Sequence, residues 1–154
     1  MKQDILVPFD GSANATEALR VAIDMAKAFN EKIVLLNVQQ SFETPHTKRF
    51  FSQTQIDDYR AQMAGEALQS GEEMLKKSGV EFMAKTRIGD AREQICQEAT
   101  ADSTEGAVCK DHGMRLIVMG SRGLNALLGS VLGSVSTGVL NHAPCPVTIV
   151  PYSC

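Results

Sequence analysis

Apolar residues recur along the chain in two alternating patterns, short unbroken runs and longer stretches with helical spacing. Four short, mainly apolar runs have the length and composition of strands buried on both faces of a sheet: 5–9, 33–38, 116–119 and 147–150. A fifth stretch, 80–88, alternates and predicts a strand with one partly exposed face. Helical spacing occupies the segments between them: 15–30, 56–75, 90–99 and 134–142. This alternation predicts one α/β domain, residues 1–154, with a parallel five-stranded sheet and helices on both faces.

Turn and cap signals set the expected limits of these elements. Asn14 with Glu17 three residues later predicts a capping box at the start of the first helix, and Ser12 is a further expected cap. Residues 39–54 show no period and predict a long connection. A polar interruption at 100–106 predicts a surface insertion around 100–110, to which we assign no function.

The segment 116–139 contains the glycines that suggest a ligand-binding site. Gly120 and Gly123 follow a predicted buried strand, and Gly133 and Ser134 open a helix nine residues later. Glycines let backbone N–H groups approach a ligand, and the first N–H groups of a helix favour anions. The pattern therefore indicates a phosphate site, with Ser134 and Ser136 as further hydroxyl donors. The alternative is a glycine-rich connection that only allows the backbone to turn and binds no ligand.

Gly120-x2-Gly123-x9-Gly133-Ser134 resembles the nucleotide-binding signature of the universal stress proteins. It is not a Walker A loop, because no lysine follows Lys110. The segments 7–12 and 142–147 extend the resemblance to nearly the whole chain, and the insertion departs from it. The resemblance implies a flavodoxin-like sheet of order 3-2-1-4-5, ATP (or ADP or AMP, with Mg²⁺ on the phosphates) as ligand, and a homodimer through the edge strand 147–151.

In that sheet order the chain changes direction between the first and fourth strands, and ligands bind at such a switch point. Asp10 and Gly120 end those two strands, so both face one crevice. The Asp10 carboxylate suits a ribose hydroxyl, and the backbone of Val38 suits the purine. The alternatives are a helix-capping Asp10 and a core valine at 38. The predicted nucleotide site comprises Pro8, Asp10, Val38, Met119, Gly120, Arg122, Gly123, Gly133, Ser134, Val135 and Ser136.

The composition of the chain argues against nucleic acid and membrane as its main partners. Eighteen acidic residues against fifteen basic ones give a net charge of −3, which argues against nucleic acid as the main partner. No apolar run approaches the ~20 residues that a membrane helix needs. The first strand starts near Asp4, so we expect no signal peptide and a cytoplasmic protein with reduced thiols at 96, 109, 145 and 154.

We therefore expect an ATP-binding regulatory protein of the stress response, with little or no turnover. One alternative is an interaction module of the same fold whose glycine loop is vestigial. Another is a slow ATPase or phosphoryl-transfer enzyme, although the sequence offers no obvious base, P-loop lysine or metal-carboxylate pair. His142 and Cys145 lack a second pair of ligands, so we expect no metal site held by protein side chains.

Overall fold

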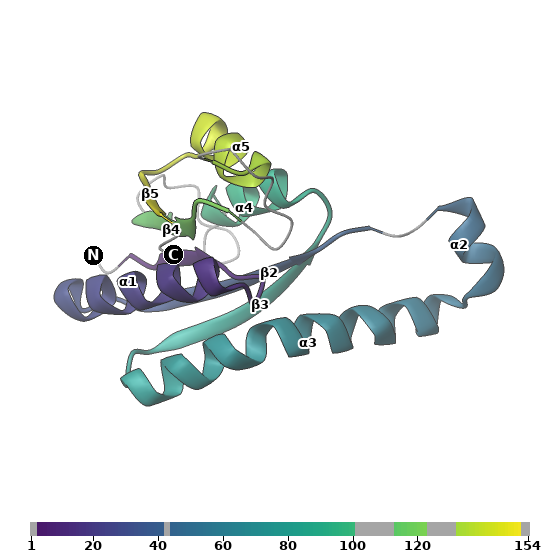
Figure 1. The fold of residues 1–154 in the computed structure, drawn as a ribbon, viewed down its shortest axis with the longest axis horizontal. Coiled ribbons are helices and arrows are strands. Elements are labelled where there is room, and N and C mark those ends of the chain that lie inside the picture. Colours follow the sequence, from purple (N-terminus) through teal and green to yellow (C-terminus); the bar gives the residue numbers. More distant parts are fainter. Residues whose placement is uncertain (1–2, 42–43, 101–112, 123–131, 152–154) are drawn as a thin grey trace.

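The computed structural model describes residues 3–41, 44–100, 113–122 and 132–151, and it confirms the predicted fold (Figure 1). All strand pairs are parallel, and the sheet order is β3-β2-β1-β4-β5. The elements are β1 (Ile5–Pro8), α1 (Ala13–Phe29), β2 (Ile33–Gln39), α2 (Pro45–Phe50), α3 (Gln53–Ser78), β3 (Phe82–Ile88), α4 (Ala91–Thr100), β4 (Leu116–Gly120), α5 (Ser134–His142) and β5 (Val147–Val150).

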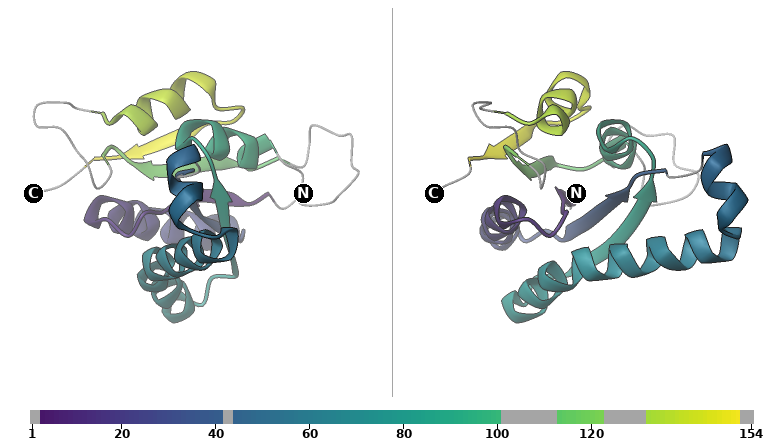
Figure 2. Two further views of the ribbon diagram at one scale, coloured as in Figure 1. Left: turned by 90° about the vertical axis from the view of Figure 1, so that its right-hand side faces the viewer. Right: turned by 45° about the vertical axis from the view of Figure 1, so that its right-hand side comes forward.

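Two apolar layers enclose the sheet because its central strands are apolar on both faces. Alternate residues of β1, such as Ile5 and Val7, pack with α1 and α3, while Leu6 packs with α4 and α5. Figures 1 and 2 show α1 and α3 on one side of the sheet and α4 and α5 on the other. The alternation of the two faces along each strand is what a doubly covered parallel sheet requires.

The start of α1 confirms the expected Ser12 cap and differs from the expected capping box. Ser12, not Asn14, is the N-cap, and its hydroxyl accepts a hydrogen bond from Ala15 N at 3.1 Å. Glu17 forms an ion pair with Arg20 instead of closing a capping box. The predicted box is therefore wrong, and Asn14 lies buried inside the first turn of the helix.

The segment 39–54 also differs from the prediction of a long connection without structure. Pro45 occupies the first turn of the short helix α2, and the Thr44 side chain caps it. A capping box of Ser52 and Gln55 then starts α3, which ends at Gly79 as predicted. Figure 2 shows α2 and the start of α3 extending beyond the carboxyl ends of the strands.

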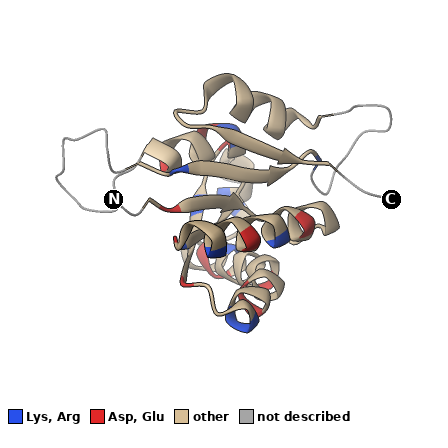
Figure 3. Cartoon of the chain, turned by 90° about the vertical axis from the view of Figure 1, so that its left-hand side faces the viewer, with Lys and Arg blue, Asp and Glu red and all other residues tan. Residues whose placement is uncertain are grey.

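The surface carries charges of both signs. Figure 3 shows Lys and Arg interspersed with Asp and Glu along the helices of the α1 and α3 layer. None of the helices in the described ranges is both long enough and apolar enough to cross a bilayer. The predicted insertion around 100–110 lies outside the described residues except for Thr100, which ends α4.

Candidate functional site

The sheet opens at the carboxyl ends of β1 and β4. The two strands pair at Ile5↔Leu116 and Leu6↔Ile117, yet they continue to Pro8 and Gly120. Beyond the paired part, β1 leads into α1, on one face of the sheet. This is the switch point that the sheet order predicts, the place where ligands bind in open parallel sheets of this kind.

Asn14 joins the elements around this opening. Its Nδ2 donates to the Val150 carbonyl at 3.1 Å, and its Oδ1 accepts from Arg122 N at 2.9 Å and from Ser121 Oγ at 3.2 Å. The side chain is almost fully buried, and it packs directly against the backbone of Gly120. Asn14 thereby ties the first turn of α1 to the ends of β4 and β5.

The start of α5 is held to the same place. Gly133 N donates to the Ser121 carbonyl at 2.7 Å. The Ser136 hydroxyl donates to the carbonyls of Gly120 and Ser121 at 2.9 and 3.1 Å, and its side chain is buried. Ser136 therefore fastens α5 to the end of β4, and its proton points at main-chain oxygens, not toward the opening. Ser134, one residue into the helix, is exposed.

Gly133 is the N-cap of α5 and has no capping side chain. Its φ of −72° and ψ of 167° are ordinary extended values, so the glycine is not required by backbone strain. Among the described residues, a Cβ at this position would meet Ser121 O and Arg122 Cα, at the ordinary contact distances of 3.4 and 3.6 Å. The first N–H groups of α5 lie at the positive end of the helix dipole, and no side chain in the described ranges caps them.

The end of β2 presents main-chain groups to the same opening. Leu36 O accepts from Phe9 N on the β1 side, and Gln39 O accepts from Gly89 N on the β3 side. Because successive residues of a strand face opposite neighbours, the N–H and C=O of Val38 face β1. The pairing with β1 ends at Pro8↔Leu36, and the Phe9 carbonyl accepts from Asn37 Nδ2 at 2.9 Å. Asn37 thus takes the acceptor that the Val38 N–H would meet in a continued ladder.

Four further predicted residues lie at or near the ends of β1 and β4 and the start of α5, and a fifth lies outside the described residues. Pro8 ends β1, and Asp10 follows it with one carboxylate oxygen accepting from Ser12 N at 2.9 Å. Met119 is buried in β4, and Val135 packs on the apolar cluster under α4 and α5. Gly123 lies outside the described residues.

Sequence reasoning missed the two buried amides that shape the site, Asn14 and Asn37. Their signal was a polar side chain inside an apolar pattern, since Asn37 interrupts the run Ile33–Val38. A buried amide needs partners, and these two find them in the backbone at the switch point.

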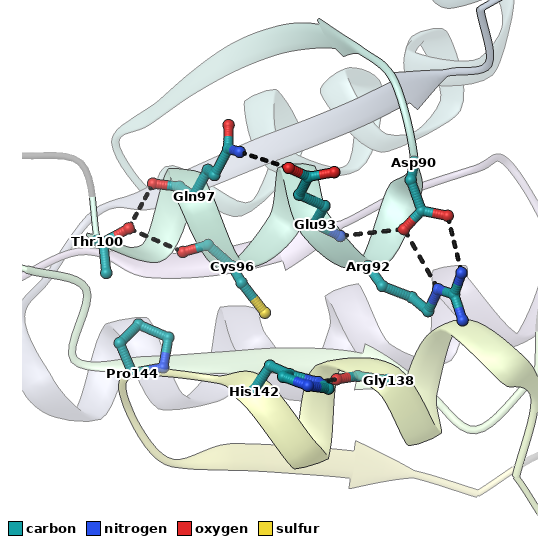
Figure 4. Close-up of a pocket in the computed structure, with 9 residues that line it drawn as sticks. All are labelled: Asp90, Arg92, Glu93, Cys96, Gln97, Thr100, Gly138, His142 and Pro144. Carbon is teal, nitrogen blue, oxygen red and sulfur yellow. Dashed lines mark hydrogen bonds and ion pairs between the residues drawn. The ribbon is translucent and has the colours of Figure 1, made fainter.

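A second hollow, of about 450 Å³, lies between α4 and α5 (Figure 4). It is lined by Asp90, Arg92, Glu93, Cys96, Gln97, Thr100, Gly138, His142 and Pro144, none of which belongs to the predicted nucleotide site. Hydrogen bonds from Arg92 hold the pKa of Asp90 below its usual range, and burial raises the pKa of the Cys96 thiol. Cys96 and Cys145 are free thiols. The part of the chain that the structure describes contains no cluster of three His, Cys, Asp or Glu side chains able to hold a metal.

Comparisons with known proteins agree with this architecture. The model of the Universal stress protein family matches residues 1–151. A putative universal stress protein of Staphylococcus haemolyticus is 31% identical over 150 residues, covering 96% of this chain and 84% of the relative. Universal stress protein UspA from Lactobacillus plantarum has a similar solved structure, with a TM-score of 0.76, 26% identity, and coverage of 96% of this chain and 97% of that one. A protein of the same family from Arabidopsis thaliana, solved with AMP bound, shares the fold with a TM-score of 0.65 at 22% identity, covering 99% and 93% of the two chains.

Proposed function

The chain belongs to the universal stress protein family, and we propose that it binds ATP in the crevice between β1, β2, β4 and α5. One observation supports this proposal: three kinds of ligand-binding group lie at element ends on the carboxyl side of the sheet, around the switch point between β1 and β4. They are the strand-edge groups of Val38, the carboxylate of Asp10 and the N-terminal N–H groups of α5.

Val38 supports an adenine base in particular. Its N–H is a donor and its C=O an acceptor, and both face the side that β1 vacates. The Watson–Crick edge of adenine offers the complementary pair, an acceptor at N1 and a donor at the 6-amino group. A 6-oxopurine reverses both groups, so the same strand edge disfavours guanine and hypoxanthine.

The phosphates belong at the start of α5. A phosphate there meets N–H groups without intrahelical partners and the positive end of the helix dipole. Gly133 leaves the approach open, and the Ser134 hydroxyl is exposed beside it. Arg122, held through its N–H by Asn14, adds a cation to the same region. Asp10 repels phosphates and therefore suits the ribose hydroxyls between base and phosphates.

Solved structures with this fold support an adenine nucleotide. Universal stress proteins have been solved with AMP, with dAMP and with cAMP. These three ligands share the adenine ring and a phosphate, which are the two parts that Val38 and α5 would hold. We propose ATP, with Mg²⁺ on its phosphates, as the ligand of this chain, acting as a regulatory signal in the stress response with little or no turnover.

Gly133→Val tests the proposal. The backbone at 133 has the extended dihedrals that valine favours, and a Cβ there meets described atoms only at ordinary contact distances, so we expect the variant to fold. Its branched side chain should nevertheless block the approach to the α5 N–H groups. We expect ATP at a hundredfold excess over its Kd to stabilise the wild type by about 2.7 kcal/mol and Gly133→Val not at all, read as a thermal shift.

Ser134→Ala is the matched control, because it removes one hydroxyl at the same helix start and leaves the N–H groups open. It should weaken ATP binding by only about 1 kcal/mol, or somewhat more if the hydroxyl meets a charged phosphate oxygen. Equal shifts for wild type and Gly133→Val would place the nucleotide elsewhere. No shift for any of the three proteins would favour the interaction module with a vestigial loop.

A further inference from the structure

Two side-chain amides form a short chain at the end of β2. Asn37 Nδ2 donates to the Phe9 carbonyl at 2.9 Å, and Gln39 Nε2 donates to Asn37 Oδ1 at 2.5 Å. Asn37 is buried and Gln39 is partly exposed. Both residues lie on the same face of β2, because they are two positions apart. The chain thus runs from the end of β1 to the rim of the proposed base site.

The direction of these hydrogen bonds is fixed by chemistry. The Phe9 carbonyl only accepts, so the NH₂ group of Asn37 must point at it, and Asn37 Oδ1 must point away. Asn37 Oδ1 also only accepts, so Gln39 must present its NH₂ group to it. The amide orientation of Gln39 is thereby set, and its Oε1 is turned away from Asn37.

The main chain holds Gln39 in place as well. Its carbonyl accepts from Gly89 N at 2.9 Å, which pins the last residue of β2 to the turn after β3. Gln39 directly follows Val38, whose main-chain groups face the crevice. The residue that follows the proposed base-binding strand edge therefore carries an acceptor, Gln39 Oε1, that its amide partner leaves unused.

We propose that Gln39 is a specificity residue that accepts the second proton of a purine 6-amino group. This rests on the proposed adenine site at Val38. The 6-amino group carries two protons, and the Val38 carbonyl accepts only the one on the Watson–Crick edge. Gln39 Oε1 accepts the other, so the protein distinguishes an unsubstituted 6-amino group from an alkylated one.

The experiment compares ATP with N6-methyl-ATP, which has a single proton on that nitrogen. Dissociation constants for both nucleotides are measured by calorimetry for the wild type, Gln39→Met and Gln40→Met. Methionine keeps the length of glutamine and removes the amide. Gln40 is the matched control, because it is the next residue, has the same side chain and is exposed.

We expect the preference of the wild type for ATP over N6-methyl-ATP to fall about fivefold in Gln39→Met, as for one hydrogen bond. Gln40→Met should keep the preference of the wild type. Gln39→Ala, which demands no packing of a new side chain, should reproduce the loss. An unchanged preference in both Gln39 variants, with ATP still bound, would overturn the role of Gln39 alone. A wild type that binds neither nucleotide would overturn the proposed function together with this inference.

Discussion

Asn14 explains why residue 120 is a glycine, and this explanation can be tested by a double-mutant cycle. A Cβ built on Gly120 would lie 2.7 Å from both Cγ and Oδ1 of Asn14 and 3.1 Å from its Nδ2. These are the three nearest atoms, and all belong to one buried side chain. Gly120→Ala should therefore destabilise the protein through overpacking, by about 2 kcal/mol.

Asn14→Ala removes the side chain that a Cβ at position 120 would meet, and it also removes three hydrogen bonds. The Val150 carbonyl keeps a hydrogen bond from Ser121 N at 3.0 Å, so losing its bond from Asn14 should cost little unfolding free energy. The Arg122 N–H and the Ser121 hydroxyl lose an acceptor, and we expect a cost of about 2 kcal/mol in unfolding free energy.

The two effects should not add. Independent sites would give about 4 kcal/mol for the double variant, whereas removal of the close contact predicts about 2–3 kcal/mol, a coupling of about 1–2 kcal/mol. Urea unfolding followed by circular dichroism measures all four proteins.

Gly65→Ala combined with Asn14→Ala is the control pair. Gly65 lies in α3, and a Cβ added there would have no atom within 4 Å, so alanine should stabilise by about 0.5–1 kcal/mol and add simply to Asn14→Ala. If Gly120→Ala and Asn14→Ala were also additive within about 0.5 kcal/mol, the argument that Asn14 dictates the glycine would be refuted.

Two further predictions concern the edge strand and a buried carboxylate. The carbonyls of Pro146 and Val150 face β4, so the N–H of Ile149 faces the free edge of the sheet. Ile149→Pro should therefore abolish the expected homodimer in analytical ultracentrifugation while the pairing of β5 with β4 remains. A wild type that is monomeric at micromolar concentration would contradict this prediction. Burial alone would raise the pKa of Glu98, but hydrogen bonds from Lys85 and Arg87 outweigh it and leave the pKa lowered. The contribution of ionised Glu98 to the free energy of unfolding is therefore fully present above the ordinary glutamate pKa. It is lost as the pH falls through the lowered pKa of Glu98 in the folded protein. Glu98→Gln should cost about 2–3 kcal/mol at neutral pH in urea unfolding and progressively less in acid, and a pH-independent difference would exclude this origin.

The strands were predictable because their signals are local. An unbroken apolar run such as Ile33–Leu36 is buried on both faces only in the middle of a covered sheet. The crossover rules restrict the strand order without fixing it, and the order 3-2-1-4-5 was expected from the family resemblance and is confirmed. The glycine and serine positions around β4 and α5 also followed from local spacing. The short helix α2 did not, because its start depends on the Thr44 cap and Pro45 within a segment without apolar period.

The partners of the polar residues were not predictable, because they are distant in sequence. Asn14 meets Val150 across 136 positions and Arg122 across 108. From neighbouring residues alone, an asparagine before a helical run is expected to be a helix cap. In the structure the Ser12 hydroxyl caps the helix instead. Ser136 was predicted as a ligand donor for the same reason, and its actual acceptors lie at the end of another strand.

The two buried asparagines act on the sheet in related ways, and this connects the fold to the site. Asn37 occupies the Phe9 carbonyl and so leaves the Val38 N–H facing the opening. Asn14 occupies the Arg122 N–H, just after β4, and the Val150 carbonyl at the end of β5. Strand ends that separate would otherwise leave buried polar groups unpaired, at a cost of about 1–3 kcal/mol each. Because side chains of the protein supply partners for these main-chain groups, the separation of the ends of β1 and β4 does not need a ligand to satisfy them.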